Sequence, residues 1–173
     1  MKKKCILFYI FLTLSVALNI FIIVQSSLEG AESTNQSSWV VALFKNVINT
    51  FFPNLINDSN IESFTIIIRK LVGQFGLFFV DGIFTFLALY FSPIKIQKII
   101  LLYVISLIFG LLIASLTEII QSFKDGRSGQ VSDVLIDFAG YLIGSFILFF
   151  IFFLINHKET KIDKEHQIDN TNV

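Results

Sequence analysis

The sequence predicts an all-α membrane protein with about four transmembrane helices and an amphipathic interfacial helix in the first outer loop. Its 173 residues are 54% hydrophobic, with a mean hydropathy of +0.76, whereas soluble domains are only about 45–50% apolar. Four helices of about 20 residues, the length that crosses a bilayer, nearly fill such a chain. We therefore expect one transmembrane domain over residues 1–155 and a polar tail over residues 156–173.

Four long apolar runs supply these spans. The first follows three lysines and is too long for the core of a signal peptide, and Gln25-Ser26-Ser27 offers no small-residue cleavage pattern. A retained helix is therefore the better interpretation. The tail has no apolar period, so we expect it to be irregular. The predicted spans are residues 5–24, 71–91, 99–116 and 134–155.

The amphipathic helix is expected between the first two spans. Residues 26–38 are polar and predict a loop. After them, apolar side chains recur at the spacing of one helical face, with Ser38 placed to begin the helix and Pro53 to end it. Trp39 at the start favours a position in the headgroup layer. Packing on the helix bundle is an equal alternative.

Polar side chains interrupt the second span. Lys70, Gln74, Asp81 and Thr85 follow at spacings of four, seven and four, which places them on one face of an α-helix. An ionised aspartate near the bilayer centre costs roughly 2.5–3.5 kcal/mol, so Asp81 must be protonated, paired or hydrated. The pattern predicts either a polar cleft running inward or one aspartate hydrogen-bonded between helices.

The basic residues predict the orientation. With the N terminus inside, eight lysines lie on the cytoplasmic side and five basic residues lie outside. We therefore expect a multi-pass protein of the cell membrane with both termini cytoplasmic. The thirteen basic and thirteen acidic residues cancel, so we expect no nucleic acid partner.

A dense polar segment joins the third and fourth spans, and it should face outward. Ser106, Gly110 and Ala114 form a small-residue face on the third span, and Gly140 and Gly144 form a G-x-x-x-G on the fourth. We expect these two helices to pack as a hairpin with four polar residues at its mouth, namely Glu118, Gln121, Asp133 and Asp137. The structural alternative is that Asp133 caps the fourth helix and pairs with Arg127.

Two chemistries fit these residues. Basic side chains can grip an anionic headgroup such as a phosphate, and carboxylates can recognise amines or hydroxyls. Alternatively, Glu118 or Asp133 can act as acid or base in a hydrolysis or transfer. The sequence has no Cys/His cluster, so we expect neither a metal nor a cofactor. The ligand-binding candidates are Arg69, Lys70, Gln74, Glu118, Gln121, Arg127, Ser128, Asp133 and Asp137.

The block Thr117-Glu118-Ile119-Ile120-Gln121, the segment Gly126–Asp133, and Asp137 with Gly140 together resemble the signature of the VanZ-like family. Gln25-Ser26-Ser27 and Arg69-Lys70 fit the same pattern, and the resemblance covers about residues 5–155. It implies a membrane protein of a Gram-positive cell that lowers susceptibility to teicoplanin, a lipid-bearing glycopeptide antibiotic.

Two positions depart from the family pattern. Gln74 stands where the family usually has histidine, and Asp137 stands where it usually has asparagine. Gln74 cannot do acid–base work, so we interpret the site as one of recognition before catalysis. The expected ligand is a membrane lipid headgroup, a peptidoglycan precursor or the antibiotic itself.

Two other functions remain open. The chain could be a membrane-embedded enzyme that modifies a lipid-linked or acylated envelope substrate. It could also be a partner-binding subunit, or a homo-oligomer that uses the face of Gly140 and Gly144.

Overall fold

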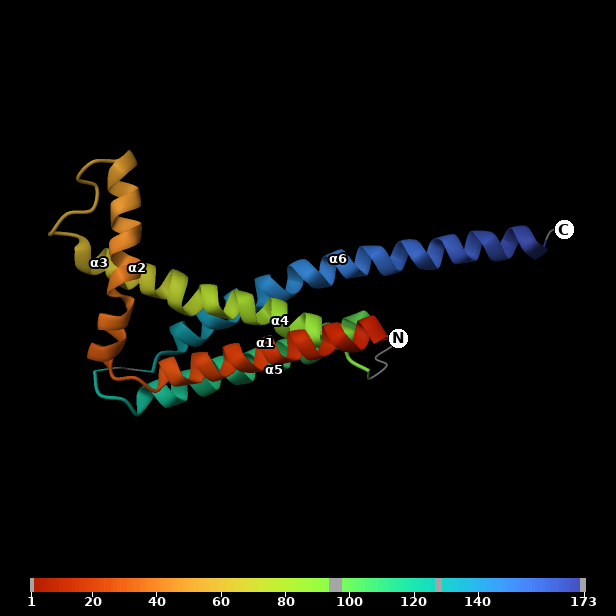
Figure 1. Ribbon diagram of the computed structural model, residues 1–173, viewed down its shortest axis with the longest axis horizontal. Coiled ribbons are helices and arrows are strands. Elements are labelled where there is room, and N and C mark those ends of the chain that lie inside the picture. Colours follow the sequence, from red (N-terminus) through yellow and green to blue (C-terminus); the bar gives the residue numbers. More distant parts are fainter. Residues whose placement is uncertain (1, 94–97, 127–128, 172–173) are drawn as a thin grey trace.

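The computed structural model describes residues 2–93, 98–126 and 129–171, and these residues form helices and no strands (Figure 1). Both termini lie at one end of the molecule, and the chain turns back on itself between successive long helices. The elements in chain order are α1 (Lys2–Ser26), α2 (Gly30–Phe51), α3 (Ile61–Ile68), the π-helix η1 (Arg69–Gly76), α4 (Leu77–Phe91), α5 (Ile99–Ser122) and α6 (Val131–Thr171).

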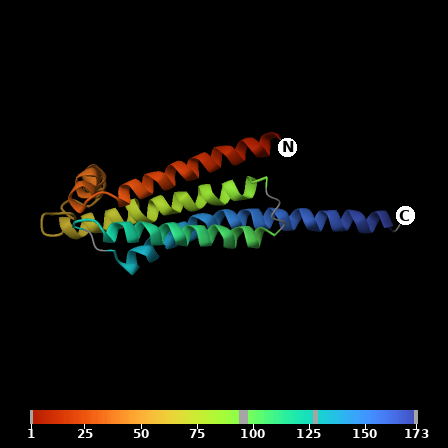
Figure 2. The ribbon, with the colours of Figure 1, turned by 90° about the horizontal axis from the view of Figure 1, so that it is seen from below.

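Four stretches of the described chain are long and apolar enough to cross a membrane. They are Lys3–Ser26, the continuous helix Ile61–Phe91, Ile99–Ser122 and Val131–His157. Each predicted span falls inside one of them, which confirms the predicted fold class. The four stretches run side by side, and α6 continues beyond the others at the end that carries the termini (Figure 2).

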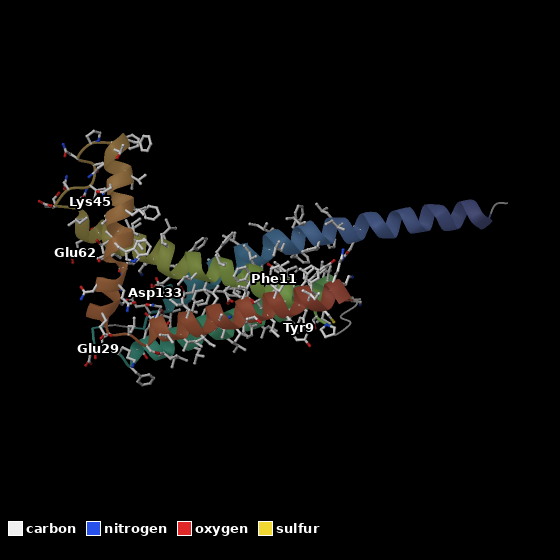
Figure 3. All side chains as sticks on the ribbon, in the orientation of Figure 1. Tyr9, Phe11, Glu29, Lys45, Glu62 and Asp133 are labelled. Atoms are coloured by element: carbon white, nitrogen blue, oxygen red, sulfur yellow. The ribbon has the colours of Figure 1, made fainter. Side chains whose placement is uncertain are left out.

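Burial in the bundle follows the pattern of a protein dissolved in lipid. Large apolar side chains cover the outside (Figure 3), whereas several buried residues are polar. Because lipid tails are as apolar as leucine, helices in a bilayer associate through close packing and polar contacts rather than through apolar burial. The buried polar residues are Ser15, Asn19, Ser26, Asp81, Thr85, Ser106, Thr117, Glu118, Asp137 and Ser145.

Glycines bring α6 against the second span. A Cβ on Gly140 would collide with the backbone of Phe75, and one on Gly144 with the backbone of Phe79. These contacts, which we call the glycine seam, correct two expectations. The G-x-x-x-G packs mainly on η1 and α4 rather than on the third span, and the face of Gly140 and Gly144, expected to serve a homo-oligomer, is already covered by η1 and α4 of the same chain. It is therefore not free to form a dimer interface.

The small-residue face of α5 is buried, as expected, and it receives α6 in another way. Gly110 leaves room for the ring of Tyr141, and a Cβ there would meet that ring. The Ser106 and Tyr141 hydroxyls lie 3.0 Å apart, and either can be the donor. The third and fourth spans therefore are neighbours, joined by a large side chain fitted against small ones.

The π-helix changes the register of the second span. A π-helix makes i→i+5 hydrogen bonds and turns less per residue than an α-helix, and such segments often mark functional sites. Counting a single face at 3.6 residues per turn therefore fails across residues 69–76. Lys70 pairs with Asp133 at the start of α6, whereas Asp81 and Thr85 contact Asn19 and Ser15 of α1. The predicted single polar face is therefore wrong.

The helix α2 begins eight residues before the expected cap Ser38, at Gly30, so the prediction of a loop over residues 26–38 is wrong beyond its first few residues. The Ser38 hydroxyl bonds the Asn35 carbonyl within the helix instead of capping it. The segment lacks proline and internal glycine, so its polar composition does not prevent a helix. The helix ends at Phe51, just before Pro53, as predicted.

One face of α2 packs on α3, where Val41 meets Phe64 and Ile68. A second apolar stripe remains exposed, formed by Trp39, Leu43, Val47 and Phe51 at four-residue intervals. Packing on the bundle is therefore confirmed for one face, while the position of the exposed stripe in a headgroup layer stays a prediction.

The last helix extends through the charged tail to Thr171. This differs from the irregular segment expected there. Residues 156–171 contain no proline or glycine and several good helix formers, so nothing in the sequence ends α6 once the apolar run is passed.

Candidate binding pocket

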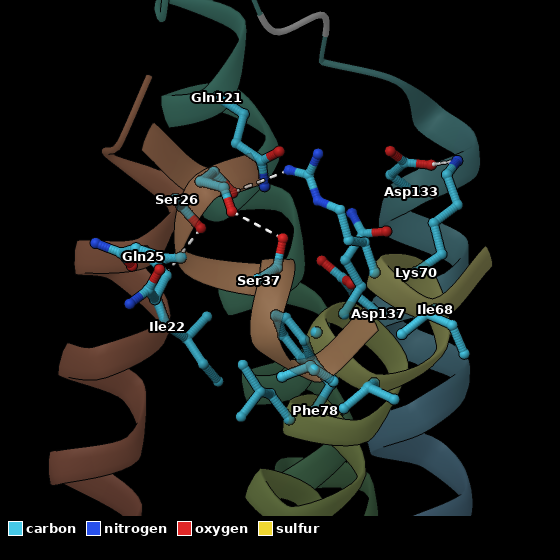
Figure 4. A pocket seen from close by; sticks show the side chains of 18 of the residues that line it. Ile22, Gln25, Ser26, Ser37, Ile68, Lys70, Phe78, Gln121, Asp133 and Asp137 are labelled. Atoms are coloured by element: carbon cyan, nitrogen blue, oxygen red, sulfur yellow. Dashed lines mark hydrogen bonds and ion pairs between the residues drawn. The ribbon is translucent and has the colours of Figure 1, made fainter. Parts of the chain in front are cut away.

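A pocket of about 780 Å³ (Figure 4) lies at the end of the bundle opposite the termini, which are marked in Figure 1. Its volume falls within the range of small-molecule sites, about 300–1,000 Å³. The ends of α1 and α5, the start of α6, the π-helix and the N-terminal half of α2 all contribute to its lining. The lower wall is apolar and includes Ile22, Ile68 and Phe78, while the upper part is polar.

The helix α2 forms one wall of this pocket. Ser33 and Ser37, one turn apart, both line it. The Arg69 guanidinium donates a hydrogen bond from Nη2 to the Ser33 hydroxyl at 2.9 Å. This bond joins α2 to the π-helix across residues that are far apart in the sequence.

The π-helix supplies the three predicted residues of the second span. Arg69, Lys70 and Gln74 all lie within η1, and all three line the pocket. The wider turn of a π-helix thus coincides with the charged and amide side chains that the second span contributes to the pocket, while α3 and α4 contribute apolar ones such as Ile68 and Phe78.

An ion pair links the π-helix to α6. Lys70 Nζ lies 2.5 Å from Asp133 Oδ1, with the lysine side chain 37% and the aspartate side chain 14% exposed. Asp133 sits inside the first turn of α6, which begins at Val131, so it is not the N-cap. Its negative charge is nevertheless favourable there because the N-terminal end of a helix carries a partial positive charge.

Asp137 lies one turn deeper on α6 and is 1% exposed. Its Oδ1 atom has no hydrogen-bond partner among the described residues, and the same is true of Gln74 Oε1. Both side chains line the pocket. The charged groups that act on Asp137 are Glu118, Asp133 and Lys70. The two residues that depart from the family pattern therefore meet in one pocket, each with an unused acceptor oxygen.

Glu118 is buried but has a different place. It is 4% exposed, does not line the pocket, and its Oε2 atom accepts a hydrogen bond from the backbone N–H of Gln130 at 3.0 Å. Gln130 directly precedes the first residue of α6. Because the first N–H groups of a helix lack partners within it, Glu118 acts in part as a cap supplied from α5.

Asp81 belongs to a separate polar cluster. Asn19 Nδ2 donates to Asp81 Oδ1 at 2.7 Å, and Thr85 Oγ1 donates to the same oxygen at 3.3 Å. Ser15 Oγ lies 2.8 Å from the Thr85 hydroxyl. Asp81 does not line the pocket, so the predicted cleft does not reach it. The alternative, an aspartate hydrogen-bonded between helices, is what the structure has.

Six of the nine predicted ligand-binding residues line the pocket together. Glu118 lies outside it, and Arg127 and Ser128 lie outside the described residues. The six are Arg69, Lys70, Gln74, Gln121, Asp133 and Asp137.

Sequence reasoning missed the wall made by α2. Its lining residues Ser33, Gln36 and Ser37 were assigned to a loop, although their spacing and the absence of glycine and proline would have supported a helix. Gln25 and Ser26 also line the pocket, and the resemblance to a family pattern did indicate them.

The arrangement is suited to recognition by hydrogen bonds and charge. It brings one ion pair, one buried carboxylate and several amides and hydroxyls to the polar side of a partly apolar pocket. Within the part of the chain that the structure describes, no three His, Cys, Asp or Glu side chains are grouped to hold a metal ion.

Comparison with known proteins identifies one family. The family model described as VanZ/LLP1 matches residues 8–154, which is most of the chain. No curated protein and no solved structure matches the sequence.

Proposed function

Because the chain belongs to the VanZ/LLP1 family, we propose that it lowers susceptibility to teicoplanin-type lipoglycopeptide antibiotics through its pocket. In this proposal the pocket faces outward and binds an envelope lipid headgroup, a cell-wall precursor or the antibiotic. The observation that carries the proposal is a cavity of about 780 Å³ that joins an apolar wall to a charged one at one end of a membrane bundle.

The lining suits an amphiphile. Phe21, Trp39 and Ile66 line the pocket and are also exposed on the outside of the bundle, where lipid would surround them. An apolar chain can therefore pass from the bilayer to the pocket wall while a headgroup meets the polar side chains. A soluble polar ligand would leave the apolar wall unused.

Two features support an outward-facing pocket: its position in the molecule and the distribution of lysines. The pocket lies at the end opposite both termini. The positive-inside rule favours cytoplasmic termini in the cell membrane, and the pocket then opens at the outer surface. The exposed apolar stripe of α2 would rest in the outer headgroup layer beside it.

The test is protection of a teicoplanin-susceptible Gram-positive strain that expresses the chain. Lys70→Gln and Asp133→Asn each remove one partner of the pocket ion pair, and Asp125→Asn makes the same chemical change at an exposed site outside the pocket. At equal amounts of protein in the membrane fraction, we expect the two pocket variants to lower the minimum inhibitory concentration toward that of the empty vector. Protection that persists in both pocket variants would contradict the proposal.

The enzymatic alternative has weaker support. Glu118, one of its two acid–base candidates, holds the backbone of Gln130 and does not line the pocket. Asp133, the other, is paired with Lys70. We therefore favour binding over catalysis.

A further inference from the structure

Two buried polar atoms of the pocket have no hydrogen-bond partner in the described part of the chain, and both are acceptors. Gln74 Oε1 and Asp137 Oδ1 are buried, line the pocket and have no partner among the described residues. Both atoms are acceptors: one is an amide oxygen and the other a carboxylate oxygen. A buried acceptor without a partner is unfavourable, so a ligand that fits here must bring donors.

The cationic side chains of the pocket are already engaged. Lys70 pairs with Asp133 at 2.5 Å, and Arg69 donates to Ser33 at 2.9 Å. The charged groups that act on Asp137 are two carboxylates, Glu118 and Asp133, and one ammonium, Lys70. Negative charge therefore predominates around Asp137, which favours a cation over an anion at this point.

We propose that the part of the pocket at Gln74 and Asp137 binds a primary ammonium group carried by an amphiphile. This inference rests on the proposed function and names the chemistry of its ligand. An ammonium donates three hydrogen bonds, and its positive charge complements the carboxylate of Asp137. Figure 4 shows Asp137 on the side of the pocket toward Phe78 and Ile68, so the ammonium binds close to the wall that receives the apolar part.

Two sources offer this chemistry: an aminophospholipid of the membrane and an amine of the lipoglycopeptide. The binding experiment uses purified protein in phosphatidylcholine nanodiscs and native mass spectrometry. The lipid probes are phosphatidylethanolamine, phosphatidylcholine and phosphatidylglycerol with identical acyl chains. The antibiotic probes are teicoplanin and teicoplanin with its amines acetylated. Phosphatidylcholine is the informative control because it carries a cationic nitrogen without N–H donors.

We expect a preference of about tenfold for one amine-bearing probe over its control, the effect of one charge-assisted hydrogen bond. A preference for phosphatidylethanolamine identifies the lipid as the source, and a preference for unmodified teicoplanin identifies the antibiotic. Asp137→Asn and Gln74→Leu should each reduce the preference, whereas Asp125→Asn should leave it unchanged. The wild-type probe series needs no variant, so a folding defect in Asp137→Asn does not prevent the test.

The outcomes separate this inference from the proposed function. If a probe is retained by the wild type, is lost in Lys70→Gln, and shows no preference for amines, the pocket binds a ligand and the ammonium site is wrong. If no lipid probe and neither form of teicoplanin is retained, the inference is wrong, and of the proposed ligands the lipid headgroup and the antibiotic are excluded. Persistence of protection in Lys70→Gln and Asp133→Asn is what contradicts the proposed function.

Discussion

Lys70 Nζ lies 2.5 Å from Asp133 Oδ1, and this pair joins the π-helix of the second span to the first turn of α6. The two residues are 63 positions apart in the sequence. The lysine side chain is 37% exposed, so solvent screens the pair and its contribution to stability is small. Its main effect is to fix two walls of the pocket relative to each other.

A double-mutant cycle measures that contribution. We expect Lys70→Gln and Asp133→Asn to show a coupling free energy of about 0.2–1 kcal/mol, the range for exposed ion pairs. Thermal unfolding in detergent at low and high salt is the measurement, and the coupling should fall as salt rises. A coupling of several kcal/mol would show that the pair is far better shielded than its exposure indicates.

The glycine seam should tolerate no side chain. Gly144→Ala places a Cβ against the backbone of Phe79, and Gly140→Ala places one against the backbone of Phe75. Backbone atoms cannot move aside as a side chain can, so we expect each variant to lose at least about 1–3 kcal/mol of unfolding free energy.

Gly73→Ala is the matched control, since a Cβ there meets nothing within 4 Å. It lies in η1, the π-helix that also contains Phe75, and its folded yield and melting temperature should stay close to those of the wild type. Equal behaviour of Gly73→Ala and Gly144→Ala would argue against the seam.

The polar cluster around Asp81 should support the fold without taking part in binding. Asp81→Ala removes the acceptor shared by Asn19 and Thr85. Hydrogen bonds between membrane helices contribute about 0.6 kcal/mol on average and up to about 1.7 kcal/mol, so we expect a loss of about 1–2 kcal/mol. The measurement is unfolding by denaturant in mixed micelles.

Two comparisons make this prediction specific. Ser115→Ala removes a hydroxyl that bonds only the carbonyl of its own helix, from Leu111, and should have little effect. Ligand retention by folded Asp81→Ala should equal that of the wild type. Loss of binding in a stable Asp81→Ala would mean that the cluster communicates with the pocket.

Filling the pocket should remove protection. Ser37 lines the pocket from α2, whereas the adjacent Ser38 is exposed and does not. Ser37→Trp therefore places an indole in the cavity, and Ser38→Trp places the same side chain on the outside. We expect teicoplanin protection to fall only in Ser37→Trp, measured at equal protein levels. Similar protection by both variants would show that this cavity is not used.

The sequence predicts the spans well because apolar length alone determines them. Ile99–Ser122 and Val131–His157 extend each prediction by a few residues, and the buried face of Ser106, Gly110 and Ala114 follows from helical spacing. The partner of Gly140 and Gly144 was not predictable, because small residues permit close approach without specifying which helix approaches.

The pocket was predicted only in part. Lys70, Gln74, Asp133 and Asp137 could be grouped by topology, whereas Asp81 was left open between a polar cleft and a hydrogen bond between helices, because the count assumed an α-helix where the chain forms a π-helix. The contribution of α2 was missed since serine, asparagine and glutamine also predominate in loops. The part of α2 that packs on α3 begins only at Val40, so the apolar pattern that indicates a helix does not extend back to Ser33 and Ser37.

The glycine seam also bears on how a ligand reaches the pocket. Backbone packed on backbone at Gly140 and Gly144 leaves α4 and α6 no room to slide or part without losing the contact. By contrast, α2 is held by side-chain contacts, among them an apolar cluster with α3 and the bond between Arg69 and Ser33. The contact of α6 with η1 and α4 is thus made between backbones, whereas that of α2 is made between side chains. We therefore expect exchange of ligand to occur by displacement of α2.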